Sequence, residues 1–71
     1  MRHCLKGRPL SDRERQVLRM TCDGKRQGEI AKALFVAPRT VEKHRHNIRE
    51  KTGTRTPLEL ALWAIRNGIA A

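Results

Sequence analysis

Apolar and polar residues recur with a helical period over four segments of this chain, and residues typical of helix ends lie beside each segment. In the first segment, Val17 and Leu18 lie on the apolar side of a helix. Ser11 with Glu14 forms the capping-box pattern that begins helices, because each side chain can bond the backbone N–H of the other. The pattern therefore predicts a helix over about residues 12–23.

The next two segments predict a short helix and a long helix joined by a three-residue turn. The short helix covers residues 27–34 and the long one residues 38–52. Pro38 suits the first position of the long helix, where a missing N–H has no cost. We expect Phe35 and Val36, both in the turn, to be buried.

The fourth segment predicts a helix over residues 57–67, which Thr56 caps and Pro57 begins. No segment shows the strict alternation of apolar and polar residues that is typical of a strand. The expected fold is therefore all-α, a four-helix bundle containing a helix-turn-helix, in a domain of residues 10–71 after a flexible tail or linker stub of residues 1–9. The i, i+3, i+4, i+7 spacing predicts a core-facing stripe of Leu58, Ala61, Leu62 and Ile65.

The charge of the chain narrows the classes of partner. Sixteen Lys and Arg residues stand against seven Asp and Glu residues, which gives a net charge of +9 over 71 residues. So large an excess of positive charge predicts a polyanionic partner, although a solvated cationic surface that serves solubility is an alternative. No apolar run is long enough to cross a bilayer. Cys4 and Cys22 have no metal-ligand or redox spacing, and we expect reduced thiols in a cytoplasmic protein.

The sequence has none of the patterns that enzymes use. It contains no Gly-rich phosphate loop, no nucleophile with a neighbouring base and no metal-spaced cluster. We therefore expect no catalytic activity, no cofactor and no metal.

The long helix has two chemically different faces. Val41 and Ile48 lie within about 20° of each other around its axis and predict the side that packs on the core. The opposite side is a strip of hydrogen-bonding side chains, in which Arg or Lys can donate to guanine, a carboxylate can accept from cytosine, and His can donate to a base edge. A solvated polar face is the alternative. The candidates for base contact are Glu42, Lys43 and His46.

Other polar residues near these helix ends can position a phosphate backbone. Helix N-termini favour anions because their N–H groups and dipole carry positive charge. The candidates for phosphate contact are Lys25, Arg26, Gln27, Arg39, Thr40 and Arg49. Arg45 points toward the core side, where we expect it to pair with a carboxylate such as Glu14 or Glu29, and we expect His44 to be a packed histidine.

Four motifs together resemble the LuxR-type helix-turn-helix domain, also called the GerE-type domain. They are LSDRERQVL at residues 10–18, EIAKALFVAPRTVEKHRHNI at 29–48, KTG at 51–53 and AIRNGI at 64–69. The resemblance implies a bacterial transcription regulator that binds double-stranded DNA as a dimer, reads it with the third helix and carries the dimer contact on the fourth. The HRHNI and AIRNGI motifs favour the branch fused to receiver domains. The chain is then either a stand-alone regulator or the C-terminal effector domain of a response regulator. We expect it to be associated with the nucleoid in the cytoplasm, and RNA polymerase is a further candidate partner.

The chain departs from the family pattern at a few positions. Arg26 and Gly28 replace polar or basic residues common at the start of the second helix, and Ala37 replaces the usual serine cap. Glu42 stands where lysine is common, so the preferred base sequence does not transfer from relatives.

The fourth helix is the expected dimer contact, because the core stripe assigned above leaves its other side outward. An alternative is that Trp63 lies over the edge of the core. Two other functions are alternatives. One is a helical module that binds another protein through Trp63 and Leu60, and the other is a non-specific RNA or membrane binder. The second lacks aromatic residues for base stacking and has cations on all four helices. The expected dimer residues are Leu60, Trp63, Ala64 and Asn67.

Overall fold

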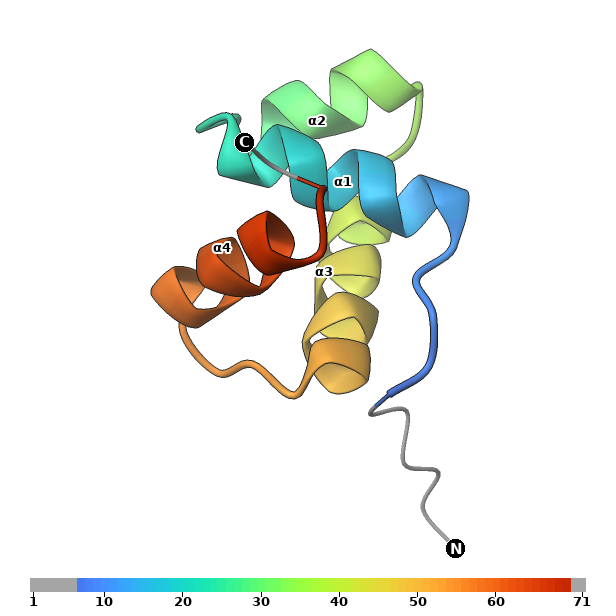
Figure 1. Ribbon diagram of the computed structural model, residues 1–71. Coiled ribbons are helices and arrows are strands. Elements are labelled where there is room, and N and C mark those ends of the chain that lie inside the picture. Colours follow the sequence, from blue (N-terminus) through green and yellow to red (C-terminus); the bar gives the residue numbers. More distant parts are fainter. Residues whose placement is uncertain (1–6, 70–71) are drawn as a thin grey trace, which may run out of the picture.

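The computed structural model describes residues 7–69, which form four helices (Figure 1). These are α1 (Asp12–Cys22), α2 (Gln27–Leu34), α3 (Pro38–Thr52) and α4 (Pro57–Arg66). The all-α fold is confirmed, and α1 and α4 each end one residue earlier than the sequence predicts. Residues 1–6 of the expected tail, with Cys4, lie outside the described residues, and the division into tail and domain stays a prediction.

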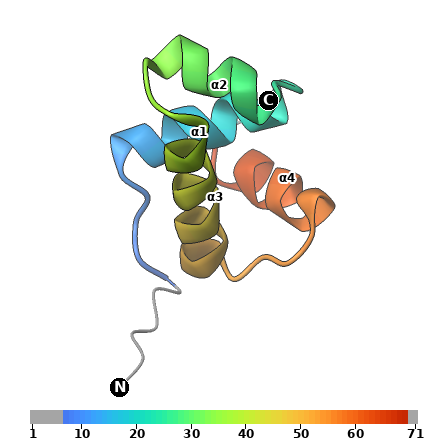
Figure 2. The same cartoon turned by 180° about the vertical axis from the view of Figure 1, so that it is seen from behind.

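One small core joins all four helices. Figures 1 and 2 show α3 crossing α1, with α2 beyond one end of α3 and α4 beside it. The five largest fully buried side chains come from α1, α2 and α3, so these three helices surround the centre of the core. The buried apolar residues are Leu10, Val17, Leu18, Ile30, Ala31, Val41, Ile48, Leu60 and Ala64.

The helix starts follow the predicted cap chemistry. The Ser11 N–H donates to Glu14 Oε1 at 2.8 Å, and the Glu14 N–H donates to Ser11 Oγ at 3.2 Å. Thr56 Oγ1 accepts from the Glu59 N–H at 3.1 Å. Ala37 precedes α3 and makes no side-chain cap bond. The start of α3 therefore depends on contacts from elsewhere in the fold.

The prediction that Phe35 is buried is wrong. Phe35 is 95% exposed and ends α2 with φ 57° and ψ 44°, in the left-handed region that disfavours side chains. This conformation redirects the chain toward α3, and it leaves the ring outside while Val36, the next residue, is half-buried against the core. The turn geometry therefore decides the exposure of Phe35, against its hydrophobicity.

The predicted core stripe of α4 is also wrong, because the helix presents the other side. Leu60 is 7% exposed and Ala64 is fully buried, whereas Leu58, Leu62 and Ile65 are 69%, 46% and 51% exposed. The segment PLELALWAI is apolar at almost every position, so its period fits two different faces. The structure packs the face that carries the small side chain of Ala64, which lets the helix approach the core closely. Leu60 and Ala64 are therefore core residues, and the expectation that they face outward is corrected.

Candidate nucleic-acid interface

The exposed face of α3 is the most distinctive surface of the molecule. Val41 and Ile48 are 0% and 1% exposed and hold the back of the helix in the core, as predicted. In Figure 2, α3 lies in front of α1, and no other labelled helix lies in front of it. A helix held in this way presents its outer side chains to any partner that approaches from that side. We call these exposed residues the α3 strip: Arg39, Glu42, Lys43 and His46.

A side-chain bond from α2 fixes the first turn of α3. Gln27 Nε2 donates to the carbonyl oxygen of Pro38 at 3.0 Å. This bond ties the N-terminal end of α2 to the N-terminal end of α3 and offsets the weak cap at Ala37. The sequence predicts phosphate contact alone for Gln27. Its positioning role was missed, since nothing in the sequence spacing links residues 27 and 38.

Most of the predicted phosphate contacts gather where these two helix ends meet. Lys25 and Arg26 are exposed just before and at the start of α2, and Arg39 is exposed in the first turn of α3. Thr40, next to Arg39, is half-buried. Two helix N-termini and three cations at one edge produce a local positive potential. Arg49 is exposed near the other end of α3, apart from this group.

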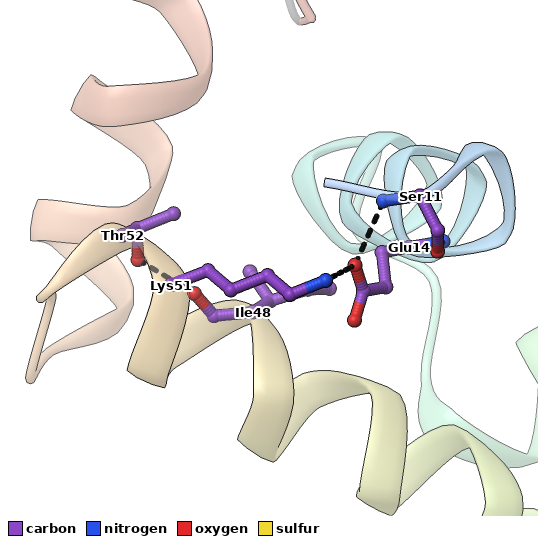
Figure 3. A network of polar contacts seen from close by, with 5 residues as sticks. All are labelled: Ser11, Glu14, Ile48, Lys51 and Thr52. Atoms are coloured by element: carbon purple, nitrogen blue, oxygen red, sulfur yellow. Dashed lines mark hydrogen bonds and ion pairs between the residues drawn. The ribbon is translucent and has the colours of Figure 1, made fainter. Parts of the chain in front are cut away.

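A buried ion pair holds the C-terminal part of α3 (Figure 3). Lys51 Nζ lies 2.6 Å from Glu14 Oε1, and that same oxygen accepts the Ser11 N–H. Glu14 is 4% exposed. Burial raises the pKa of its carboxyl, but the hydrogen bonds from Lys51 and Ser11 and the charge of Lys51 outweigh burial, so the net pKa is lowered. The Gly7 N–H also donates to the Lys51 carbonyl oxygen at 2.9 Å, so Lys51 links α3 to both α1 and the segment before it.

The predicted carboxylate partner of Arg45 is wrong. Glu14 is occupied by Lys51, and Glu29 Oε1 accepts the Arg26 N–H at 2.9 Å. Arg45 Nη2 instead lies 3.5 Å from Thr21 Oγ1 at the end of α1. The sequence placed Arg45 on the correct side of α3 but could not show which group of α1 or α2 it meets there.

The two histidines of α3 lie in different surroundings. His44 is half-buried, as expected for a packed side chain. His46 Nε2 lies 3.6 Å from Glu50 Oε1 one turn along the helix, with 69% of the His46 side chain exposed. An exposed i, i+4 pair contributes only a few tenths of a kcal/mol. This contact therefore orients His46 without preventing it from reaching a partner.

The rest of the described chain offers little other chemistry. Residues 7–69 contain no cluster of three His, Cys, Asp or Glu side chains placed to hold a metal. No helix among them has the length and apolar character needed to cross a bilayer. Cys22 is a half-buried free thiol whose pKa is raised by burial and by the nearby charge of Asp23, so it is neutral at pH 7.

Comparisons with known proteins find similar sequences among bacterial regulators. Residues 8–64 match the model of a family described as bacterial regulatory proteins, luxR family. The chain is 40% identical over 60 residues to an uncharacterized response regulatory protein, YgeK of Escherichia coli. This match covers 84% of this chain and 41% of YgeK. It is 39% identical over 61 residues to an uncharacterized transcriptional regulatory protein, YxjL of Bacillus subtilis, which covers 86% of this chain and 28% of that protein. It is 45% identical over 53 residues to the transcriptional regulatory protein UhpA of Escherichia coli, which covers 75% of this chain and 27% of UhpA. The chain thus spans less than half the length of these relatives, and no solved structure matches it.

Proposed function

The chain belongs to the LuxR family of bacterial regulatory proteins, and we propose that it reads double-stranded DNA by inserting α3 into the major groove. Members of this family are DNA-binding transcription regulators and not enzymes. The observation that carries this proposal is the exposure of the α3 strip together with the burial of Val41 and Ile48 behind it. An α-helix is about 10–12 Å across with its side chains, and the major groove, which is about 12 Å wide, admits it.

We assign different tasks to the exposed residues. Glu42, Lys43 and His46 read base edges, because they occupy the outer face of α3 and carry both donors and acceptors. The remaining cations contact phosphates and fix the register without reading sequence. Gln27 positions α3 through its bond to the Pro38 carbonyl oxygen. Its amide oxygen and its second side-chain N–H remain available to contact the DNA backbone. The phosphate contacts are Lys25, Arg26, Gln27, Arg39, Thr40 and Arg49.

We propose a homodimer on DNA through α4, with a corrected contact face. The expected residues Leu60 and Ala64 are in the core and are not available. Leu58, Leu62 and Ile65 lie on the same side of the helix, with i, i+4, i+7 spacing, and are about half exposed or more. Such a stripe is the apolar face that a second copy can cover. Trp63, half-buried against the core, and Asn67, exposed, lie on the other side of the helix and are not part of this stripe.

For the whole protein, we propose a bacterial transcription regulator in which this domain is the C-terminal effector of a response regulator. Relatives at least twice as long carry the names of response or transcriptional regulatory proteins. A cytoplasmic, nucleoid-associated location follows from binding chromosomal DNA, and RNA polymerase is a partner to be tested. The rival function of a module that grips proteins through Trp63 and Leu60 is weakened, since Leu60 is buried.

The experiment is selection of bound sequences from a pool of random duplexes by the purified domain. We expect an enriched motif, with two half-sites at a fixed spacing if the dimer forms. Binding to the selected duplex should weaken with salt with a log–log slope near −4 or −5 for each monomer, if about five phosphates are neutralised. A pool that stays random through repeated rounds, or affinity that does not depend on salt, contradicts the proposal.

A further inference from the structure

A pocket lies where α1, α3 and α4 meet, beside the α3 strip but not part of it. It has a volume of about 180 Å³. Figures 1 and 2 show the C-terminal end of α1, the middle of α3 and α4 around this junction. Its wall has two kinds of surface, cationic and apolar. We call it the junction pocket, and its principal lining residues are Thr21, Cys22, Arg45, Arg49, Leu60 and Ala61.

The cationic part of the wall lacks a counter-charge. No ion pair joins Arg45 or Arg49 to a carboxylate of residues 7–69. Arg45 is half-buried, its Nε has no hydrogen-bond partner, and its Nη2 makes only the 3.5 Å contact with the Thr21 hydroxyl. Charges taken out of water are normally paired, because desolvation is costly. The pocket therefore places an under-satisfied guanidinium where an anion can reach its terminal nitrogens.

The helix end at the pocket adds to this preference for an anion. Pro57 also lines the pocket and is the first residue of α4. The N-terminal end of a helix carries a positive partial charge. No carboxylate is among the lining residues to oppose it.

The apolar part of the wall determines what kind of anion fits. Leu60 and Ala61 of α4 and the neutral thiol of Cys22 face the same space as the two guanidinium groups. A bare inorganic anion would satisfy the arginines and leave this wall uncovered. An organic acid satisfies both surfaces, with its carboxylate on the arginines and its hydrocarbon on α4. One water molecule occupies about 30 Å³ of liquid, so the pocket holds about six water-sized groups.

We propose that the junction pocket binds a small organic carboxylate with a short apolar tail, of about the size of hexanoate. Arg45 and Arg49 hold the carboxylate, and Leu60, Ala61 and Cys22 cover the tail. The proposal rests on this pocket alone and does not depend on the reading of DNA by α3.

A phosphate of bound DNA is the competing occupant, and the position of Arg45 disfavours it. Arg45 lies six residues after Arg39, which places it about 120° around α3 from that member of the strip. A duplex that the strip enters lies on the strip's side of α3, about 120° around the helix from the direction of Arg45. Arg49 lies between the directions of the strip and of Arg45 around α3. Of the two pocket arginines, it alone can therefore contact either a ligand in the pocket or a phosphate of DNA.

The test is a titration of the ¹⁵N-labelled chain with sodium hexanoate, followed by two-dimensional NMR. We expect saturable shifts concentrated at the amides of Cys22, Leu60 and Ala61, with a dissociation constant on the order of 1 mM for so small a ligand. Hexanol and hexylamine, which have the same tail without the negative charge, should bind at least tenfold more weakly. A second measurement is protection of the Cys22 thiol from alkylation by hexanoate in a Cys4→Ser background.

Matched variants separate the pocket from non-specific binding. Arg45→Gln should weaken hexanoate about tenfold, whereas Arg66→Gln, which removes an exposed arginine of α4 outside the pocket, should leave affinity unchanged. Cys22→Leu should occupy part of the space and weaken binding, and its spectrum reports whether the fold is kept.

Three results overturn the proposal. The first is the absence of saturable shifts at these amides with tens of millimolar hexanoate, and the second is equal binding of hexanol. The third is that duplex DNA shifts the same amides and Arg45→Gln weakens all duplexes with a flatter salt dependence. In that case the pocket is a backbone phosphate site.

Discussion

The ion pair between Glu14 and Lys51 allows a stringent test of how α3 is held. Glu14→Gln keeps the size of the side chain and an oxygen that can accept the Ser11 N–H, but it removes the charge that faces Lys51. We therefore expect the domain to lose stability without losing its fold.

The magnitude follows from the exposure of the two partners. Breaking a fully buried pair costs about 3–5 kcal/mol, and breaking an exposed pair costs less than about 1 kcal/mol. The Glu14 side chain is 5% exposed and the Lys51 side chain 18%, so the Lys51 ammonium can recover part of its hydration. We expect Glu14→Gln to lower the free energy of unfolding by about 1.5–3 kcal/mol. That is a large share of the stability of a small domain, which is near the lower end of about 5–15 kcal/mol.

The loss should depend on pH in a defined direction. The pKa of Glu14 is lowered in the folded state, so its contribution is present above the unfolded pKa of 4.5 and is lost as pH falls through the folded pKa. Below that value the wild-type carboxyl is protonated and resembles glutamine. The difference between wild type and Glu14→Gln should therefore be full at pH 7 and smaller at pH 3, which lies below the unfolded pKa.

The assay is urea unfolding followed by circular dichroism at the two pH values. Glu59→Gln is the matched control, because Glu59 occupies the equivalent cap position of α4 and accepts the Arg55 N–H, but is exposed. It should cost about 1 kcal/mol or less. In the double variant with Lys51→Met, the cost of Glu14→Gln should shrink by at least about 1 kcal/mol. A loss from Glu14→Gln that is the same at both pH values, or no larger than that of the control, would show that the pair does not hold the helix.

Three further predictions concern the other exposed features. Phe35→Gly should raise the free energy of unfolding by about 1 kcal/mol, measured by the urea midpoint, because glycine adopts the left-handed conformation without strain; a lower midpoint contradicts this. Lys43→Ala should cost about 1–3 kcal/mol on the selected duplex and relax its base preference, whereas Arg39→Ala should weaken all duplexes alike and flatten the salt slope. Equal losses from both on selected and random duplex refute this division. Leu62→Glu should keep the domain monomeric in sedimentation experiments at concentrations where wild type dimerises, and an unchanged dimer removes α4 from the interface.

The sequence was sufficient for the helices and insufficient for the choice of face on α4. Cap residues and prolines act on their immediate neighbours, so Ser11, Thr56 and Pro38 locate helix starts reliably. Leu58 and Leu60 are both hydrophobic, and a choice between them depends on which fits against α1 and α3. That is a property of the packed core and not of the period.

The polar contacts that position the candidate site were harder to predict than the site itself. The strip on α3 follows from counting around one helix, which the sequence allows. The bond from Gln27 to Pro38 and the pair between Glu14 and Lys51 join different helices, 11 and 37 residues apart in the chain. Arg45 illustrates the same difficulty, since one of its two predicted partners, Glu14, is paired with Lys51.

The composition of α4 gives a physical reason to expect that this domain does not act alone. A helix that is apolar on all sides is stable in water only when more than one side is covered. The core covers Leu60 and Ala64, while Leu58, Leu62 and Ile65 remain exposed. Covering these three side chains would add about 25 cal/mol for each Å² of apolar surface removed from water, which offsets part of the entropy lost in association. Because so small a patch cannot bind tightly by itself, we expect association through α4 to be weak in free solution and strong when two copies are held on adjacent half-sites, where their effective concentration is high.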